Sequence, residues 1–317
     1  MKDALSSRVP VTLVTGFLGA GKTTLVNHLI GACPSLRFIV IENEFGDVGI
    51  DGPALQLPSE RVFELNDGCV CCTVQHDLVE VLQGLLTRLS DVDHVLIETT
   101  GLAEPGPVLR VFERQPFRDA FRLDGVVTVV DGTTLEASLD EVQACREQIT
   151  YADVLLVNKV DRLDAHQMRT ITDTIRRLNP IASIYPTEGA RAEADVVLRV
   201  GGRPPEASHG DHHHHHTHED DIQCAVVESN GDVDAGALDR WLSGLVYRQP
   251  ATLLRLKGVL AIPQDPRRFI INGVRDYVDV QPGANWGEDA RRSRIVLIGR
   301  HLDANALQRD FNDCIIH

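Results

Sequence analysis

A glycine-rich segment at residues 16–24, with the sequence GFLGAGKTT, constrains the fold of this chain more than any other feature. An apolar run, Val9–Thr15, precedes it, and an apolar run with helical spacing, Leu25–Ile30, follows it. The segment satisfies the pattern G-x-x-x-x-G-K-[ST] between a strand and a helix, which is the setting in which that pattern is specific. We therefore expect residues 9–30 to form a buried strand, a tight turn and a helix.

The alternation of strand-like and helix-like segments continues beyond this turn. Further apolar runs occur at Arg37–Ile41, His94–Ile97, Gly125–Val130 and Val154–Val157. Helical patterns separate them, for example one in which the following residues share a face: Leu78, Val81, Leu82, Leu85, Leu86 and Leu89. This alternation predicts an α/β fold over residues 1–200, with a mostly parallel sheet covered by helices on both faces.

A change of composition divides the chain after residue 200. Residues 201–221, GGRPPEASHGDHHHHHTHEDD, lack apolar periodicity, which predicts a His-rich acidic linker. Strand-like runs return at Gln223–Glu228, Thr252–Ile262, Arg268–Ile271 and Arg294–Ile298. A helical pattern with Leu307 and Phe311 on one side follows Asp303. Residues 222–317 are therefore expected to form a smaller C-terminal α+β domain.

Net charge and composition indicate which kinds of partner the protein binds and in which cellular compartment it is expected. The 317 residues include 31 lysines and arginines against 46 acidic residues, a formal net charge of −15, so a nucleic-acid partner is not expected. No run of about 18 apolar residues occurs, so no membrane-spanning helix is expected. The N-terminus lacks the features of a signal peptide, and the seven cysteines do not resemble a disulfide framework. These observations predict a cytoplasmic protein, in which clustered cysteines are metal-binding or reactive.

The residue types of the glycine-rich segment suit a phosphate. Glycines allow backbone N–H groups to wrap around phosphate oxygens, and the helix N-terminus adds partial positive charge. Lys22 is expected to neutralise the β- and γ-phosphates, and Thr23 to offer its hydroxyl to Mg²⁺. The predicted nucleotide-binding residues here are Gly16, Gly19, Ala20, Gly21, Lys22, Thr23 and Thr24. The alternative, a glycine-rich turn without a ligand, is disfavoured by the complete pattern in its setting.

The segment VLLVNKVD, at residues 154–161, indicates the base. It ends an apolar run and delivers Asn158, Lys159 and Asp161 into the following loop. The carboxylate of Asp161 only accepts hydrogen bonds, so it suits guanine, whose N1–H and exocyclic amine both donate on one edge. Beside adenine the carboxylate would lack this pairing. GTP is therefore the predicted nucleotide.

A third segment, HVLIETTGLAEPGPV at residues 94–108, completes the predicted catalytic set of Lys22, Thr23, Glu98 and Gly101. An apolar strand ends in Glu98, and Gly101 follows three residues later. In enzymes with this phosphate-binding loop, a carboxylate here holds the Mg²⁺ shell or orients the attacking water, and the glycine amide can sense the γ-phosphate. The alternative is that Glu98 only caps a loop.

These segments together resemble the CobW-type metallochaperone GTPases, a P-loop family of the SIMIBI class. The matching stretches are PVTLVTGFLGAGKTTLVNHL, IENEFGDVGID, ELNDGCVCCT, VLIETTGLAEP and NKVD, and the C-terminal NWGEDARRSRIVLIGRHLDANALQRDF matches more loosely. Asp47 stands where many members have glutamate, which preserves the charge. The resemblance implies a P-loop GTPase fold and GTP hydrolysis coupled to delivery of a transition metal, commonly zinc or cobalt, to a client.

Three cysteines crowd into the segment NDGCVCCTVQHD at residues 66–77. Cys69, Cys71 and Cys72 can supply thiolates to one ion, and soft sulfur selects Zn²⁺, Co²⁺ or Cu(I) over Mg²⁺. Three thiolates leave one tetrahedral position open, which suits an ion that is handed on. Glu42, at the end of the second apolar run, is the candidate further ligand, or a group that contacts a ligand.

Other roles for these cysteines stay open on the sequence alone. Cys69 and Cys72 have the spacing of a redox C-x-x-C pair, and all three could instead be structural thiols without a ligand. His76 follows Cys72 by four residues and is a candidate ligand, although a position on a helix surface is the more common case.

Histidines are concentrated in the predicted linker. They are His209, His212, His213, His214, His215, His216 and His218, and acidic residues surround them. Imidazoles in such a segment bind Zn²⁺, Ni²⁺, Co²⁺ or Cu²⁺, which predicts a weak secondary metal site that feeds the cysteines. A solvated connector without a ligand is the alternative.

The sequence as a whole predicts a cytoplasmic two-domain GTPase that binds zinc and transfers it to a client metalloprotein. The sequence identifies no glutamine or arginine that positions the attacking water, so a partner or a homodimer would complete catalysis. The alternatives are cobalt delivery for cobalamin synthesis, a passive metal store in which the nucleotide is structural, and a P-loop kinase with a small-molecule acceptor.

Overall fold

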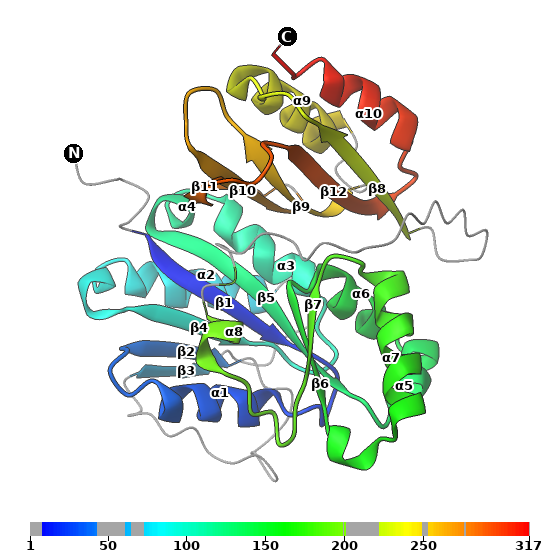
Figure 1. Cartoon of the computed structure of the whole chain (residues 1–317). Coiled ribbons are helices and arrows are strands. Elements are labelled where there is room, and N and C mark those ends of the chain that lie inside the picture. The colour runs from blue at the N-terminus through cyan, green and yellow to red at the C-terminus, as the bar shows by residue number, and fades with distance from the viewer. Residues whose placement is uncertain are drawn as a thin grey trace. The chain divides into compact units, whose positions relative to one another are not determined.

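The computed structural model describes residues 8–42, 61–64, 73–198, 200, 222–248, 253–275 and 277–316. The chain divides into two compact units, one of Met1–Arg177 with Ala182–Val200 and the other of Leu178–Ile181 with Gly201–His317. Each unit has a sheet of its own (Figure 1).

The first unit is built on a seven-stranded sheet with the order β3-β2-β4-β1-β5-β6-β7, and its described strand pairs are all parallel. Its strands are β1 (Val9–Thr15), β2 (Phe38–Glu42), β3 (Val62–Glu64), β4 (His94–Glu98), β5 (Phe121–Asp131), β6 (Val154–Asn158) and β7 (Ser183–Pro186). Its α-helices are α1 (Lys22–Ala32), α2 (Thr73–Leu85), α3 (Pro105–Leu109), α4 (Phe117–Ala120), α5 (Leu135–Glu141), α6 (Gln143–Tyr151), α7 (Ala165–Leu178) and α8 (Ala194–Val197). Short 3-10 helices are η3 (Leu89–Asp91), η4 (Arg110–Glu113) and η5 (Val160–Arg162). The predicted α/β fold is confirmed.

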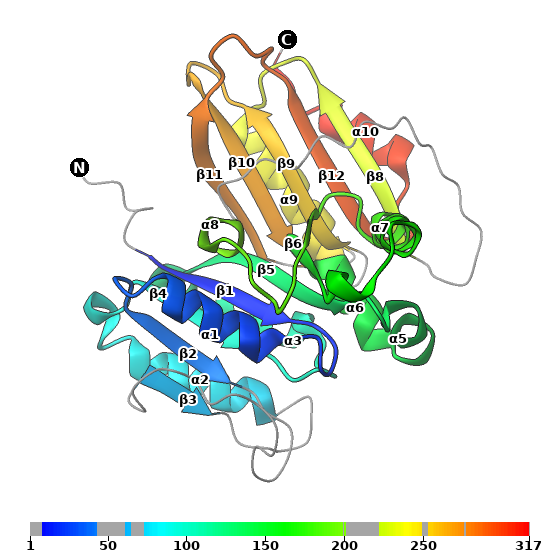
Figure 2. The same ribbon diagram turned by 60° about the horizontal axis from the view of Figure 1, so that its bottom comes forward.

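Helices cover both faces of this sheet, as the sequence predicts. Helices α1 and α8 lie on one face, and α2, α3 and α6 lie on the other (Figure 2). Because side chains alternate between the two faces of a strand, Val127 and Val129 of β5 share a core with Leu25 and Leu29 of α1. A sheet covered on both faces needs strands that are apolar throughout. Within the described residues, no helix is long and apolar enough to cross a membrane.

Helix α2 is shorter than its sequence pattern suggests. The apolar set predicted to share its face extends to Leu89, but α2 ends at Leu85 and Leu89 begins η3. The chain tightens there, because the N–H of Arg88 donates to Leu85 O (2.9 Å) and the N–H of Asp91 to Arg88 O (2.9 Å). These i→i−3 bonds close the end of the helix and turn the chain toward β4.

The second unit is a five-stranded antiparallel sheet with the order β11-β10-β9-β12-β8 and two helices. Its elements are β8 (Ile222–Ser229), α9 (Ala235–Arg248), β9 (Leu253–Ala261), β10 (Arg267–Val274), β11 (Tyr277–Asn285), β12 (Ser293–Arg300) and α10 (Ala304–Asn312). Both helices pack on one face of the sheet, where Leu238 and Leu242 of α9 share a core with Leu307 and Phe311 of α10 (Figure 1). Asp303 caps α10 by accepting a backbone hydrogen bond at 3.0 Å. The predicted α+β fold is confirmed here too.

Apolar runs in the sequence do not predict three of the strands, β3, β7 and β11. All three lie at an edge of their sheet. β3 and β7 are only three and four residues long, and β11 contains Pro282 and Gly283. An edge strand pairs on one side only, so it tolerates proline and polar residues that would mark a loop elsewhere.

The carboxyl ends of the parallel strands bring the predicted site residues to one edge of the first sheet. β2 ends at Glu42, β4 at Glu98, β5 at Asp131 and β6 at Asn158. Neighbouring ends match in register, with Glu42 opposite Glu98 and Asp131 opposite Asn158. The glycine-rich turn leaves β1, which lies between β4 and β5, so the turn emerges in the middle of this row.

A buried histidine begins β4, at the other end of that strand. His94 is 5% exposed, and its Nε2 lies 2.8 Å from Thr12 Oγ1. Burial lowers the pKa of His94 to about 4, opposed by the negative charge of Asp124 and assisted by Arg122. The ring is therefore neutral in the fold at neutral pH, whereas in the unfolded chain its pKa returns to about 6.5.

We expect His94 to destabilise the first unit as the pH falls from about 6.5 to about 4, because the unfolded chain then binds a proton that the folded chain does not. At about pH 5 the loss is about 2 kcal/mol relative to neutral pH. His94→Gln cannot titrate and should lose correspondingly less stability. Urea unfolding followed by far-UV circular dichroism measures this, since Trp241 and Trp286, the two tryptophans, both lie in the other unit. Equal pH dependence in the two proteins would contradict the assignment.

Candidate functional site

The glycine-rich turn lies directly against neighbouring strands. Gly16 has a φ of 140°, and a Cβ at this position would come to 2.1 Å from the backbone oxygen of Val129 in β5. Gly21 has a φ of 111°, and a Cβ there would come to 2.7 Å from the side-chain nitrogen of Asn158 in β6. Glycine meets both the left-handed φ and the close approach, so these contacts hold the turn in one conformation.

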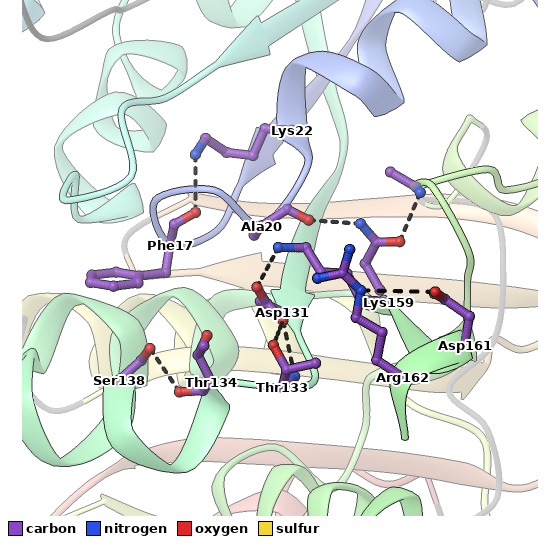
Figure 3. Close-up of polar contacts among 12 residues, drawn as sticks. Phe17, Ala20, Lys22, Asp131, Thr133, Thr134, Ser138, Lys159, Asp161 and Arg162 are labelled. Carbon is purple, nitrogen blue, oxygen red and sulfur yellow. Dashed lines mark hydrogen bonds and ion pairs between the residues drawn. The ribbon is translucent and has the colours of Figure 1, made fainter. Parts of the chain in front are cut away.

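Lys22 is the first residue of α1 and is buried, with 9% of the residue exposed. Its Nζ donates to the backbone oxygen of Phe17 at 3.3 Å, so the ammonium group reaches back across the turn (Figure 3). Burial lowers the pKa of Lys22, and the negative charge of Glu98 opposes this effect. A desolvated cation at the start of a helix favours an anionic ligand such as phosphate.

Thr23 and Glu98 meet at this edge of the sheet, although 75 positions separate them in the chain. The hydroxyl of Thr23 donates to Glu98 Oε1 at 2.7 Å, and Glu98 is 7% exposed. A hydroxyl and a carboxylate are hard oxygen donors, the type that Mg²⁺ prefers. The donor set therefore fits the Mg²⁺ ion that accompanies a nucleoside triphosphate.

The turn that follows β4 is attached to the glycine-rich turn. The N–H of Thr99 donates to Val14 O at 3.0 Å, and its hydroxyl donates to Thr15 Oγ1 at 2.8 Å. Gly101 lies so close to Leu18 that a Cβ on Gly101 would come to 2.6 Å from the Leu18 backbone nitrogen. Gly101 therefore lies beside the candidate phosphate-binding N–H groups, which is the position that sensing of a γ-phosphate requires.

Asn158 joins three segments of the site through its side-chain amide. Its Nδ2 donates to Ala20 O at 2.8 Å, and its Oδ1 accepts from Ala190 N at 2.7 Å and from Thr187 Oγ1 at 3.3 Å. The residue is 3% exposed. The sequence predicts a role in guanine selection, but most of the hydrogen-bonding capacity of this amide holds the glycine-rich turn to the segment after β7.

Asp131 is a site residue that the sequence patterns do not single out. Its Oδ2 lies 2.5 Å from Lys159 Nζ, and its Oδ1 accepts from the N–H and the hydroxyl of Thr133 at 2.9 and 2.7 Å (Figure 3). Burial favours the neutral acid, but these hydrogen bonds outweigh it and lower the pKa of Asp131. The ion pair holds Lys159, whose φ of 63° is left-handed, at the start of the predicted base-binding loop. The only signal in the sequence is the Asp-Gly step that ends an apolar run.

Asp161 lies in η5, directly after β6, and 51% of its side chain is exposed. Its Oδ2 is 3.9 Å from Nε of Arg162, whose side chain is 67% exposed (Figure 3). An ion pair of this length between exposed groups is weak. The carboxylate is therefore accessible to a ligand, as base selection by Asp161 requires.

The described residues include few of the predicted metal ligands. Three of these ligands, Cys69, Cys71 and Cys72, lie outside the described residues, as do the seven histidines from His209 to His218. Glu42 ends β2, opposite Glu98 in register. Within the described ranges, no group of three or more histidine, cysteine, aspartate or glutamate side chains is arranged to hold a metal ion.

The remaining predicted residues occupy less constrained positions. Gly19 and Thr24 are exposed, whereas Ala20 is buried. His76 lies on α2 with 71% of its side chain exposed, and its Nδ1 is 3.7 Å from Glu80 Oε1. This is the helix-surface position that the sequence favours over a ligand role.

Comparison with known proteins gives two family matches. Residues 10–186 match the family described as CobW/HypB/UreG, nucleotide-binding domain. Residues 222–315 match the cobalamin synthesis protein cobW C-terminal domain. The first match extends from within β1 to the end of β7, and the second from the start of β8 past α10.

Named relatives are similar over almost the whole chain. The zinc chaperone CobW from Pseudomonas aeruginosa is 36% identical, over 95% of this chain and 90% of its own length. The zinc chaperone YjiA from Escherichia coli is 30% identical, over 96% of this chain and 98% of its own length. A crystal structure of Zn(II)-bound YjiA GTPase from E. coli has a TM-score of 0.68 at 26% identity, and the match covers 98% of this chain and 99% of that one.

We expect Asn158→Ala to destabilise the first unit by about 2–4 kcal/mol, because it leaves the buried Ala20 O and Ala190 N without their partner. GDP affinity should fall by about tenfold or more, since the glycine-rich turn is no longer held. Thr187→Val is the matched control, because it leaves the bonds of Asn158 to Ala20 and Ala190 and removes only the two long bonds of the Thr187 hydroxyl, at 3.3 Å to Asn158 Oδ1 and at 3.5 Å to Val157 O, with an expected cost below about 1 kcal/mol. Urea and GDP titrations measure both effects. A fully stable Asn158→Ala that loses only its preference for guanine would instead support a direct base contact.

Proposed function

Because the chain belongs to the CobW/HypB/UreG family of nucleotide-binding domains, we propose that it hydrolyses GTP and couples the nucleotide to the binding and transfer of a transition metal. The observation that carries this proposal is the contact between Thr23 and Glu98, which brings the candidate Mg²⁺ residues together beside the buried Lys22. The relatives named zinc chaperones support zinc as the cargo.

Hydrolysis of GTP needs positive charge and N–H groups around the γ-phosphate. Lys22 would supply the charge, and the N–H groups of the glycine-rich turn would bind the phosphate oxygens. Thr23 and Glu98 would hold Mg²⁺, which when bound neutralises phosphate charge. Gly101 would present its N–H to the γ-phosphate from the other side of the turn.

The base would lie over the loop that follows β6. Asp161 would accept hydrogen bonds from the N1–H and the exocyclic amine of guanine, because its carboxylate is exposed and weakly paired. Lys159 would hold this loop in place through Asp131, and Asn158 would hold the loop to the glycine-rich turn. The two halves of the nucleotide site would therefore be connected by direct side-chain bonds.

The cargo site would share an element with the nucleotide site. Cys69, Cys71 and Cys72 would bind zinc as thiolates, with Glu42 as a further ligand. Glu42 and Glu98 end adjacent strands in register, so a change at Glu98 when the γ-phosphate leaves would act on the neighbouring strand end. The histidines from His209 to His218 would collect metal weakly, a client metalloprotein would receive it, and a second copy of the chain would complete catalysis.

GTP should be hydrolysed with ATP as a poor competitor, and Lys22→Ala should abolish the reaction. Asp161→Asn should lower the preference for GTP by at least about tenfold and shift it toward xanthosine triphosphate, whose base presents an acceptor where guanine has its amine. Asp164→Asn is the matched control, because the Asp164 carboxylate accepts the N–H groups of His166 and Gln167 at 2.8 Å and so caps α7. The rate of phosphate release from GTP, measured with and without competing ATP or xanthosine triphosphate, gives the activity and the nucleotide preference of all three variants. Equal competition by ATP and GTP for the unaltered protein would refute the base assignment.

Zinc affinity should differ between the protein bound to a non-hydrolysable GTP analogue and the protein bound to GDP, by about 5–150-fold as is typical of coupled sites. Linkage requires zinc to change the affinity for the analogue relative to GDP by the same factor. Competition titration against a chromophoric chelator measures the first effect, and nucleotide titration with and without zinc measures the second.

The double variant Cys71→Ser with Cys72→Ser should remove this difference and leave nucleotide binding intact. Cys224→Ser, at an exposed cysteine in β8, is the matched control and should keep the difference. Equal zinc affinities in the two nucleotide states would mean that GTP does not control the cargo, and the proposed transfer would lose its mechanism.

A further inference from the structure

Two backbone carbonyls in the turn after β4 point to a side chain on a different element. Gln148, from α6, donates through its Nε2 to Gly101 O at 3.1 Å and to Ala103 O at 3.0 Å. It is 1% exposed. The orientation of the amide follows from chemistry, because a carbonyl only accepts and so requires the nitrogen rather than the oxygen to face it. One side chain thus donates hydrogen bonds to two backbone carbonyls that lie in a turn, outside any helix or strand.

Gln148 is itself held in position from the sheet. The hydroxyl of Thr128 in β5 donates to the backbone oxygen of Gln148 at 2.7 Å, and Thr128 is 1% exposed. Helix α6 therefore has a fixed height above β5 at this residue. Because the Gln148 amide bonds to the turn that contains Gly101, the position of α6 also fixes the position of that turn.

The turn that contains Gly101 also contacts the candidate phosphate-binding loop. A Cβ on Gly101 would come to 2.6 Å from the backbone nitrogen of Leu18, so the two backbones are in direct contact. A displacement of the turn by a few tenths of an ångström would change this contact. The chain of contacts runs from β5 through Gln148 and Gly101 to the loop that is predicted to hold the phosphates.

The other end of the Gln148 amide is poorly satisfied. Among the described residues, nothing donates a hydrogen bond to its buried Oε1. A cavity of about 10 Å³ lies beside Gln148, lined by residues that include Phe17, Asp131, Thr134 and Ser138. An unpaired buried oxygen is costly, and the cavity has room for roughly one water molecule. An apolar side chain could fill this space without a buried, unpaired oxygen. The two hydrogen bonds made by the Gln148 nitrogen therefore explain the presence of an amide here better than packing does.

We propose that Gln148 is a positioning residue of the nucleotide site. It holds the turn that contains Gly101 in the position, relative to the glycine-rich turn, that is needed to distinguish GTP from GDP. The inference rests on the proposed GTPase function. Gln148 acts through Gly101, and its loss should weaken recognition of the γ-phosphate more than recognition of the rest of the nucleotide.

The test replaces Gln148 with methionine, which has a similar size and no donor. Gln148→Met should lower the ratio of affinities for a non-hydrolysable GTP analogue and GDP by about tenfold or more, and should lower kcat/KM for GTP by a similar factor, with KM rising because the γ-phosphate is bound less well. Ser138→Ala is the matched control, because Ser138 lines the same cavity but its hydroxyl donates to Thr134 O, directly before α5, at 2.9 Å. Its kcat/KM and affinity ratio should stay within about twofold of the unaltered protein. Gln148→Asn, which keeps an amide but is too short to reach both carbonyls, should behave as Gln148→Met does.

The affinity ratio separates positioning from general destabilisation. Gln148 variants with an unchanged ratio would overturn the inference, even if their kcat falls together with their melting temperature. Variants that no longer fold would show that Gln148 is needed for the fold rather than for the turn, which overturns it as well. Absence of GTP turnover in the unaltered protein would count against the proposed function, whereas turnover with unaffected Gln148 variants would count against this inference alone.

Discussion

The close approach of backbone segments around the glycine-rich turn is the constraint on which the rest of the site depends. Val129 of β5 leaves no room for a Cβ at Gly16, and Leu18 leaves none at Gly101. The turn is therefore confined by β5 on one side and by the segment after β4 on the other. Because close-packed backbone cannot shift by small amounts without clashes, the candidate phosphate-binding groups would hold their mutual positions before a ligand arrives. Preorganisation of this kind is what electrostatic catalysis requires.

Charge burial gives the same edge of the sheet a preference for anions. Burial lowers the pKa of Lys22, and the negative charge of Glu98 opposes this effect only in part. A phosphate that binds here would restore favourable interactions to the buried ammonium group. The ion pair between Asp131 and Lys159 serves a different purpose, since it holds the predicted base-binding loop.

Side-chain amides connect the parts of this site. Asn158 donates to a carbonyl of the glycine-rich turn and accepts from an N–H after β7, and Gln148 donates to two carbonyls of the turn after β4. An amide can donate and accept at once and carries no charge, so it can be buried between backbone segments at lower cost than a carboxylate or an ammonium group. At these two positions the geometry is held without charge, whereas the ion pair between Asp131 and Lys159 holds a third part of the site by charge.

The α/β class and the candidate phosphate-binding residues could be predicted from the amino-acid sequence, because both depend on patterns within short windows. Strand, turn and helix follow one another within residues 9–30, and the apolar runs of β4, β5 and β6 are continuous. Edge strands such as β11 were not predicted, because a strand at the edge of a sheet places weaker demands on residue type. The contacts of Asp131, Asn158 and Gln148 could not be predicted in this way, because they join residues far apart in the chain. Asn158 meets Ala20 across 138 positions and Gln148 meets Gly101 across 47, and an isolated amide or acid leaves no local pattern. Their partners exist only once the carboxyl ends of the parallel strands have come together at one edge.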